Sequence, residues 1–273
     1  MAELTPQEWH QRFTQQARWT ASLRKYLFEQ IPLPDEARLL EVGCGTGALL
    51  SEMSVTASPD RSSDRSAVEL RNDQYINGYA QYSLHGLDID LPSLRLCSKN
   101  APAASLTQGD AHRLPYAPAS FDAVFCHFLL LWVDDPVRVV AELKRVARPG
   151  AAVLALAEPD YGGRIDYPEE LAQLGRWQQA ALRDQGADPT TGRKLAAIFS
   201  KAGLVNIQTG VLGGQWRMDD PADDSEWQVL KHDLSGAVPE KELADLRQLD
   251  LAARRKGERI LFVPTFYSLG WVD

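Results

Sequence analysis

A stretch that combines one acid with three closely spaced glycines is the part of this chain best suited to hold a ligand. It reads Glu41-x-Gly43-x-Gly45-x-Gly47 and follows an apolar run, which predicts a buried strand, a tight turn and a helix start. Glycine has no Cβ, so the turn around Cys44 can take positive φ and lie close against a bound nucleoside. The same glycine spacing also satisfies the relaxed fingerprint of NAD and FAD proteins, so this motif alone leaves the nucleoside open.

A second acid closes the next predicted strand. The segment from Tyr82 onward is largely apolar and ends in Asp88-Ile89-Asp90. In open α/β sheets an acid at the end of the second strand accepts hydrogen bonds from ribose hydroxyls. We expect Asp88 to do so, with Ile89 as a neighbouring cofactor contact, and Asp90 to cap a helix at 91–100. This position supports a nucleoside without choosing between cofactors.

A third acid lies in Gly109-Asp110-Ala111, which Leu114-Pro115 and Phe121-Asp122 follow in that order. Together with the glycine motif and the turn Arg148-Pro149-Gly150, this arrangement resembles the class I S-adenosylmethionine (SAM)-dependent methyltransferases. The resemblance implies that Asp110 accepts the adenine amino group and that the backbone of Ala111 lies beside it. A turn or N-cap role is the structural alternative for Asp110. An NAD(P)-dependent oxidoreductase needs no acid here and is less favoured.

The resemblance covers about residues 35–160 and implies the fold. It implies an α/β three-layer sandwich with a Rossmann-like, mostly parallel seven-stranded sheet, an antiparallel last strand and a helical lid. We assign residues 1–34 to an N-terminal helical cap and residues 35–273 to a SAM-binding domain, with an insertion at 51–81 and lid segments at 158–188 and 211–257. Apolar residues at helical spacing predict a helix over 136–146, and the last strand is expected at 260–267.

Composition restricts the class of partner. The chain has 273 residues and a formal net charge of −8, which argues against nucleic acid as a substrate. It shows no apolar run long enough for a membrane span and no signal-peptide pattern at its start, so we expect a cytoplasmic protein. Three cysteines without C-x-x-C spacing and five scattered histidines predict no metal site. We therefore expect a small-molecule acceptor, SAM as cofactor with S-adenosylhomocysteine as product, and no metal. The oligomeric state is not readable.

The segment Thr5-Pro6-Gln7-Glu8 has the form of a capping box with proline in the first turn, and it predicts a helix start. In many members of the resembled family an N-terminal helix covers the SAM pocket. The resemblance therefore makes Trp19 and Arg24 candidate cofactor contacts, with Arg24 paired to the methionyl carboxylate. The alternative is an edge-packed tryptophan and a surface arginine.

Three tryptophans, Trp177, Trp216 and Trp227, fall in the predicted lid segments. Large flat side chains over a site favour an apolar or aromatic acceptor. Tryptophan also fastens small lids to their cores, so both interpretations stay open.

The chemistry that the resemblance implies is in-line displacement, in which the acceptor attacks the SAM methyl group opposite the sulfur. A general base is needed only if the acceptor is protonated. His127, at the exit of the fourth strand, is the first candidate and is also a candidate cofactor contact. Tyr161 after the fifth strand and His112 beyond Asp110 are the others. A histidine that packs on adenosine, or a SAM-fold protein with a non-methylating role, remains an alternative.

Overall fold

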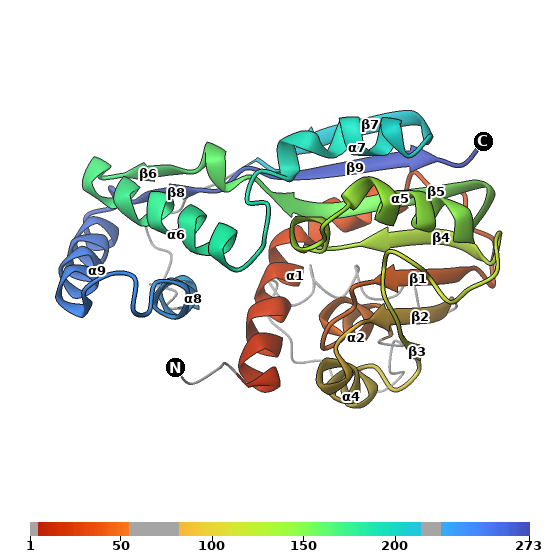
Figure 1. Cartoon of the computed structure of the whole chain (residues 1–273), viewed down its shortest axis with the longest axis horizontal. Coiled ribbons are helices and arrows are strands. Elements are labelled where there is room, and N and C mark those ends of the chain that lie inside the picture. The colour runs from red at the N-terminus through yellow and green to blue at the C-terminus, as the bar shows by residue number, and fades with distance from the viewer. Residues whose placement is uncertain (1–4, 55–81, 214–224) are drawn as a thin grey trace, which may run out of the picture.

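The computed structural model describes residues 5–54, 82–213 and 225–273. Its larger sheet has the strand order β3-β2-β1-β4-β5-β9-β7 (Figure 1). Strand β9 is antiparallel to both of its neighbours, and the other pairs that the sheet forms are parallel. This confirms the predicted sheet. The strands are β1 (Arg38–Val42), β2 (Ser83–Asp88), β3 (Ser105–Gln108), β4 (Phe121–Cys126), β5 (Ala147–Pro159), β7 (Val205–Val211) and β9 (Thr265–Trp271).

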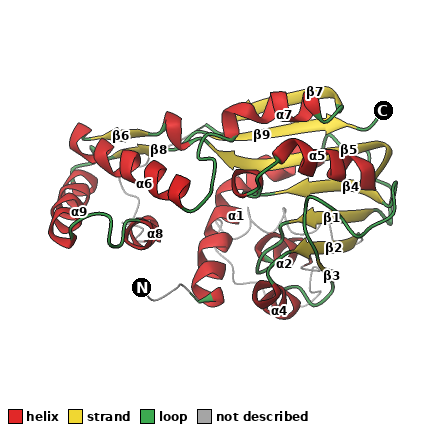
Figure 2. Cartoon of the chain, in the orientation of Figure 1, coloured by secondary structure: helices red, strands yellow, loops and turns green. Residues whose placement is uncertain are grey.

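Helices cover the sheet on both faces and bury two apolar layers (Figure 2). One layer includes residues of α1 (Pro6–Phe28), α2 (Ala48–Ser54) and α4 (Leu91–Asn100). The other includes residues of α5 (Pro136–Val146) and α7 (Leu195–Lys201). Because the central strands are covered on both sides, they are apolar along nearly their whole length. Parallel strands meet at their carboxyl ends, so the loops that follow β1, β2 and β4 lie at one edge.

Local sequence signals set where these helices begin. Thr5 and Glu8 form the predicted capping box of α1. The side chain of Asp90 accepts from the amide of Ser93 at 2.9 Å, which confirms it as the N-cap of α4. Asp135 caps α5 in the same way through the amide of Arg138. The capping residues therefore fix the point at which each loop at the ligand edge ends.

A second unit lies beside the sheet, at the left of Figure 1. We call it the lid unit. Its apolar cluster joins Leu171, Leu174, Trp227, Leu230 and Leu234, and Trp177 packs against that cluster. The unit consists of β6 (Ile165–Tyr167), η3 (Glu169–Leu171), α6 (Ala172–Asp184), α8 (Ser225–Asp233), α9 (Glu240–Arg255) and β8 (Ile260–Phe262).

Buried ion pairs hold the lid unit together. Asp250 accepts from Trp227 Nε1 at 2.9 Å and from Arg259 Nε at 2.6 Å. Arg259 also reaches Asp166, which pairs with Arg164 at 2.7 Å. These contacts join β6, α8, α9 and the segment before β8. Removing one carboxylate would leave buried arginines uncompensated.

The last strand differs from its prediction. Residues 260–267 were expected to form one strand, but β8 pairs with β6 in a separate two-stranded sheet and β9 begins only at Thr265. Pro264 separates them, since proline has no N–H to continue a ladder. Residues 51–54 of the predicted insertion belong to α2, and its remainder, 55–81, lies outside the described residues.

Candidate active site

The glycine turn between β1 and α2 has the conformation that its sequence predicts. Gly43, Gly45 and Gly47 have φ of +77°, +50° and +81°. A Cβ on Gly43 would lie 2.8 Å from Leu129 Cδ1, and one on Gly47 would lie 2.6 Å from Cys97 Sγ. Both positions require glycine for conformation and for space. The turn therefore brings bare backbone to the carboxyl edge of the sheet.

Asp88 fastens this turn to the neighbouring strand. Its Oδ2 accepts from the amide of Gly45 at 2.7 Å, and its Oδ1 accepts from the amide of Asp90 at 2.9 Å. Burial raises the pKa of the Asp88 carboxyl, and hydrogen bonds from the backbone amides of Asp90, Gly45 and Ile89 act in the opposite direction. The carboxylate retains acceptor capacity, since its two oxygens have four lone pairs between them.

Glu41 is a buried carboxyl group, and one of its oxygens lacks a hydrogen-bond donor among the described residues. It is 2% exposed, and its Oε2 has no hydrogen-bond partner among the described residues. Burial raises its pKa well above the ordinary value, while the charge of Arg24 lowers it. An unsatisfied buried acceptor costs free energy unless a ligand pairs with it. Glu41 also lines the cavity described next, so a cationic ligand group there has a partner ready.

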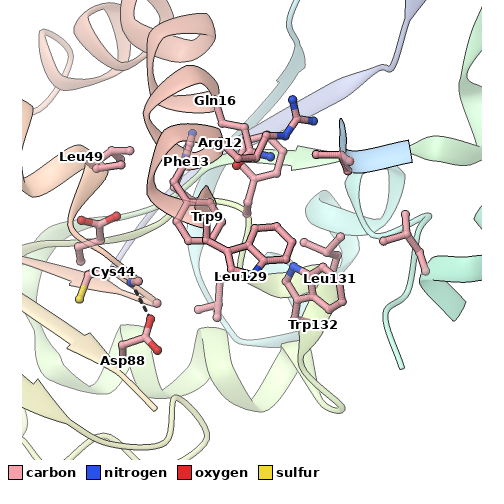
Figure 3. Close-up of a pocket in the computed structure, with 18 of the residues that line it drawn as sticks. Trp9, Arg12, Phe13, Gln16, Cys44, Leu49, Asp88, Leu129, Leu131 and Trp132 are labelled. Carbon is pink, nitrogen blue, oxygen red and sulfur yellow. Dashed lines mark hydrogen bonds between the residues drawn. The ribbon is translucent and has the colours of Figure 1, made fainter. Parts of the chain in front are cut away.

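The cavity has a volume of about 240 Å³ and lies between the glycine turn, α1 and the lid unit. Figure 3 shows Trp9, Arg12, Phe13 and Gln16 of α1 above it, with Cys44 and Asp88 on one side and Leu131 and Trp132 on the other. The rings of Trp9 and Phe13 stack with their centroids 5.7 Å apart. The rest of the lining is Glu41, Gly43, Gly45, Ala48, Leu49, His127, Phe128, Leu129, Tyr161, Leu182, Gln185, Val229 and Asp233.

The third predicted acid lies at the same sheet edge but outside this cavity. The amide of Gly109 donates to the carbonyl of Asp88 at 3.0 Å, so the ends of β2 and β3 adjoin. Asp110 Oδ1 accepts from the amide of His112 and contacts its Nδ1, both at 2.8 Å. These contacts lower the pKa of Asp110. Ile89 is 67% exposed beside them. Asp110, Ala111 and Ile89 therefore flank an open part of the edge next to Asp88.

His127 and Tyr161 both line the cavity. His127 Nε2 lies 3.0 Å from Thr20 Oγ1, which ties the imidazole to α1. Burial and the charge of Arg24 lower the pKa of His127 well below its ordinary value, so the ring is neutral at pH 7. Tyr161 belongs to η2 (Tyr161–Gly163) and packs against a small apolar cluster that includes Leu182.

Trp19 and Arg24, the two candidates from α1, do not line the cavity. Trp19 is 53% exposed and lies under the guanidinium of Arg12. Arg24 is buried and pairs with Glu52 of α2. The arginine of α1 that reaches the lining is Arg12.

Sequence reasoning missed the aromatic side chains that form the cavity. Trp9, Phe13 and Trp132 line it, whereas Trp177 and Trp227 belong to the interior of the lid unit. Trp216 lies outside the described residues. The spacing of Trp9 and Phe13, four positions apart on one helix, is a signal that could have identified one wall. Trp132 follows a strand in a short turn, where no periodicity marks it.

Within the part of the chain that the structure describes, no group of three or more His, Cys, Asp or Glu side chains is placed to hold a metal ion. Nor does any described helix have the length and apolarity needed to cross a membrane.

Comparison with known proteins provides independent evidence for the family. The family described as "Methyltransferase domain" matches residues 67–155. An uncharacterized methyltransferase of Schizosaccharomyces pombe, C1B3.06c, is 28% identical over 67% of this chain and 62% of its own. The demethylmenaquinone methyltransferase of Bacillus licheniformis is 26% identical over 72% of this chain and 81% of its own. The chain thus spans less than two thirds of the fission-yeast relative.

A solved structure shows the same fold. The YcgJ protein of Bacillus subtilis has a TM-score of 0.50 and 18% identity, over 92% of this chain and 97% of its own. The strand order, the glycine turn and the family match agree. The match to the methyltransferase domain and the methyltransferase relatives, together with the fold, support a class I SAM-dependent methyltransferase.

Proposed function

We propose that this protein transfers the methyl group of SAM to a small-molecule acceptor. The observation that carries the proposal is Glu41 Oε2, a buried carboxyl oxygen with no hydrogen-bond partner among the described residues, on a cavity that bare glycine backbone also lines. SAM has an α-ammonium group that supplies the missing donor, so the residues present fit this cofactor. A nicotinamide dinucleotide has no ammonium group to offer Glu41.

Each of three acidic residues would bind a different part of the cofactor. Glu41 would accept from the ammonium group, and the remaining acceptor capacity of Asp88 would serve the ribose hydroxyls. Asp110 would accept from the adenine amino group on the open edge, where it retains Oδ2 beyond its contacts with His112. The cavity would then hold the methionyl end of SAM, and the adenosine end would extend toward Ile89.

Aromatic side chains form the acceptor side. Trp9 and Phe13 stack on α1, while Phe128, Trp132 and Tyr161 face the same cavity. Such rings bind flat apolar molecules through large contact areas and favour offset or edge contacts. We therefore propose an aromatic acceptor. The relative named demethylmenaquinone methyltransferase makes quinol-type rings the first to try.

When bound, SAM supplies a methyl group on a sulfonium, which is already an activated leaving group. The residues of this chain hold the two reactants in line and exclude water between α1 and the lid unit. Alignment of this kind is worth up to about 10 kcal/mol of the barrier. His127, neutral at pH 7, would accept the acceptor's proton, and Tyr161 would orient the acceptor. We propose that residues 1–34 act as a cap and that the lid unit closes over the acceptor.

The cytoplasmic location and the absence of a metal from the reaction remain predictions from the sequence. A SAM-fold protein with a non-methylating role, or an NAD(P)-dependent oxidoreductase, is the competing interpretation.

The test uses SAM with a radiolabelled methyl group. The protein is incubated with SAM and a panel of naphthoquinols, catechols, aliphatic amines and RNA, and with a metabolite extract. Label should move to a quinol or another aromatic member. Transfer to RNA alone would overturn the small-molecule acceptor. SAM binding without transfer to any member or to the extract would favour the non-methylating alternative.

A further inference from the structure

The turn that leaves β4 forms much of one wall of the cavity. His127, Phe128, Leu129, Leu131 and Trp132 all contribute to the lining. Phe128 has φ of +54°, in the left-handed region, where a residue with a Cβ is strained. Strained backbone persists only where the surroundings hold it in place. The wall of the cavity therefore depends on whatever fixes this turn.

Glu158, near the end of β5, holds the turn. It is fully buried, and its carboxylate accepts from three successive backbone amides. Oε1 accepts from Leu129 and Leu130 at 2.9 Å each, and Oε2 accepts from Leu131 at 3.3 Å. These are the free N–H groups at the start of η1 (Leu130–Trp132), where a negative charge is favourable.

No described side chain pairs with Glu158 as a counter-charge. On β4, the thiol of Cys126 has its pKa raised by burial and by Glu158, and so it stays neutral. On β9, the residue opposite Glu158 is Phe266. From η4 (Gly192–Lys194), Gly192 approaches the Glu158 carbonyl, and Arg193 pairs with Asp160 instead. Within the described part of the chain, the three amides are therefore the groups that balance this carboxylate.

We infer that Glu158 is a positioning residue that couples the shape of the cavity wall to pH. In its ionised form Glu158 holds the turn that bears Leu129, Leu131 and Trp132, and in its protonated form it releases that turn. Burial raises the pKa of Glu158 to about 7, against which the three amides act. A neutral carboxyl is a weaker acceptor than a carboxylate, so protonation loosens all three bonds together.

The effect of Glu158 on acceptor affinity rests on the proposed function, whereas its effect on the turn does not. Because the ionised form holds the wall, acceptor KM should fall as pH rises through about 7 and then level off. The pH dependence of S-adenosylhomocysteine binding should follow Glu41 in our proposal, and it should therefore be the same in the wild type and in Glu158→Gln.

Trp132 offers a readout that needs neither cofactor nor acceptor. The protein is labelled with 5-fluorotryptophan, and the Trp132 signal is identified by its loss in Trp132→Phe. In the wild type this fluorine resonance should shift with a midpoint near pH 7. In Glu158→Gln, which cannot ionise, the shift should disappear. His127 cannot produce it, because its pKa lies well below the ordinary value.

A matched control is Glu142→Gln. Glu142 also accepts a backbone amide, that of Leu114 at 2.8 Å, but it lies outside the cavity lining. This variant should retain the wild-type titration of Trp132. Glu158→Asp, which keeps the charge on a shorter side chain, should restore part of it.

A wild-type Trp132 resonance that does not titrate between pH 5.5 and 8.5 would overturn the inference, even if Glu158→Gln fails to fold. So would an unchanged titration in a folded Glu158→Gln. Failure of the proposed function looks different: the protein would bind no SAM while Trp132 still titrates.

Discussion

The amide nitrogen of Gly45 donates to Oδ2 of Asp88 over 2.7 Å, and this bond joins the glycine turn after β1 to the end of β2. The turn and the acid are 43 positions apart in the chain. Because the amide takes one lone pair on that oxygen, the carboxylate is oriented along the sheet edge with other lone pairs still available. A ribose diol placed there would meet a carboxylate that is already fixed. The relationship explains why the two motifs occur together.

Gly45→Ala tests the turn, with Gly150→Ala as its matched control. Both residues have positive φ, so each substitution should cost about 1–2 kcal/mol of stability. A Cβ on Gly45 would lie 3.3 Å from the Phe13 ring at the cavity, whereas a Cβ on Gly150 meets nothing within 4 Å. Calorimetric titration with S-adenosylhomocysteine should show weaker binding only for Gly45→Ala. Equal losses in both variants would mean that strain, not the site, is responsible.

Glu41→Gln should weaken the binding of S-adenosylhomocysteine by about 10-fold to 100-fold, because it removes a charge-assisted bond worth about 1.5–3 kcal/mol. Glu142→Gln serves again as the control, since its carboxylate lies outside the cavity. Calorimetry on all three proteins makes the comparison. Unchanged affinity in Glu41→Gln would separate Glu41 from the cofactor.

The pH dependence of binding follows from the same group. Burial raises the pKa of Glu41 well above 4.5, so the cofactor-free carboxyl stays protonated above that value. An ammonium group favours the carboxylate, so binding should release a proton, and affinity should rise with pH until the free Glu41 ionises. Conversely, without ligand the free energy of unfolding should fall as pH rises from about 4.5 to the raised pKa of Glu41, because in that range the folded state binds more protons than the unfolded one. Titrations in two buffers of different ionisation enthalpy measure the proton. A release of the same size in Glu41→Gln would assign it to another group, such as Asp88.

Substitutions of Trp132 and Trp177 distinguish an effect on acceptor binding from an effect on folding stability. Trp132→Ala should raise acceptor KM about 10-fold with little loss of stability, since this side chain is 47% exposed at the cavity. Trp177→Ala should leave KM near the wild-type value and cost about 2–3 kcal/mol, because Trp177 packs in the lid unit. Steady-state kinetics and denaturant unfolding distinguish them. A KM effect confined to Trp177→Ala would restore the original expectation for the lid tryptophans.

His127→Asn tests the general base. With an acceptor that must lose a proton, kcat should fall by about 100-fold or more, and the affinity for S-adenosylhomocysteine should change little. Tyr161→Phe should affect acceptor KM more than kcat. If His127→Asn keeps its turnover while Tyr161→Phe loses it, the two roles are assigned the wrong way round.

The sequence was informative where short-range chemistry decides the structure. The glycine turn, the cap at Asp90 and the capping box at Thr5 depend on neighbours a few residues away, and all three formed as predicted. The strand count and the antiparallel direction of the last strand followed from the family resemblance. The sequence predicted an acid at the end of the second strand and another after the third, and the pairing of β2 with β3 brings Asp88 and Asp110 to the same edge.

Long-range contacts explain what the sequence did not predict. The ion pair of Arg24 with Glu52, 28 positions away, was not predicted, and the contact of Arg24 with the cofactor carboxylate stays a prediction. The pairing of β6 with β8 joins segments nearly 100 positions apart. Trp132 and Glu158 matter because β4 and β5 are neighbours in the sheet, and neither residue belongs to a recognisable motif. Partner choice at such distances depends on packing, which local patterns do not encode.

Equilibrium titration of the wild-type protein with SAM, S-adenosylhomocysteine and NADPH tests the central claim most directly. The account predicts saturable binding of SAM and S-adenosylhomocysteine at one site per chain, with micromolar dissociation constants on the order of those common for small ligands, and no competition by NADPH. Absence of SAM binding at millimolar concentration, or displacement of SAM by NADPH, would contradict it.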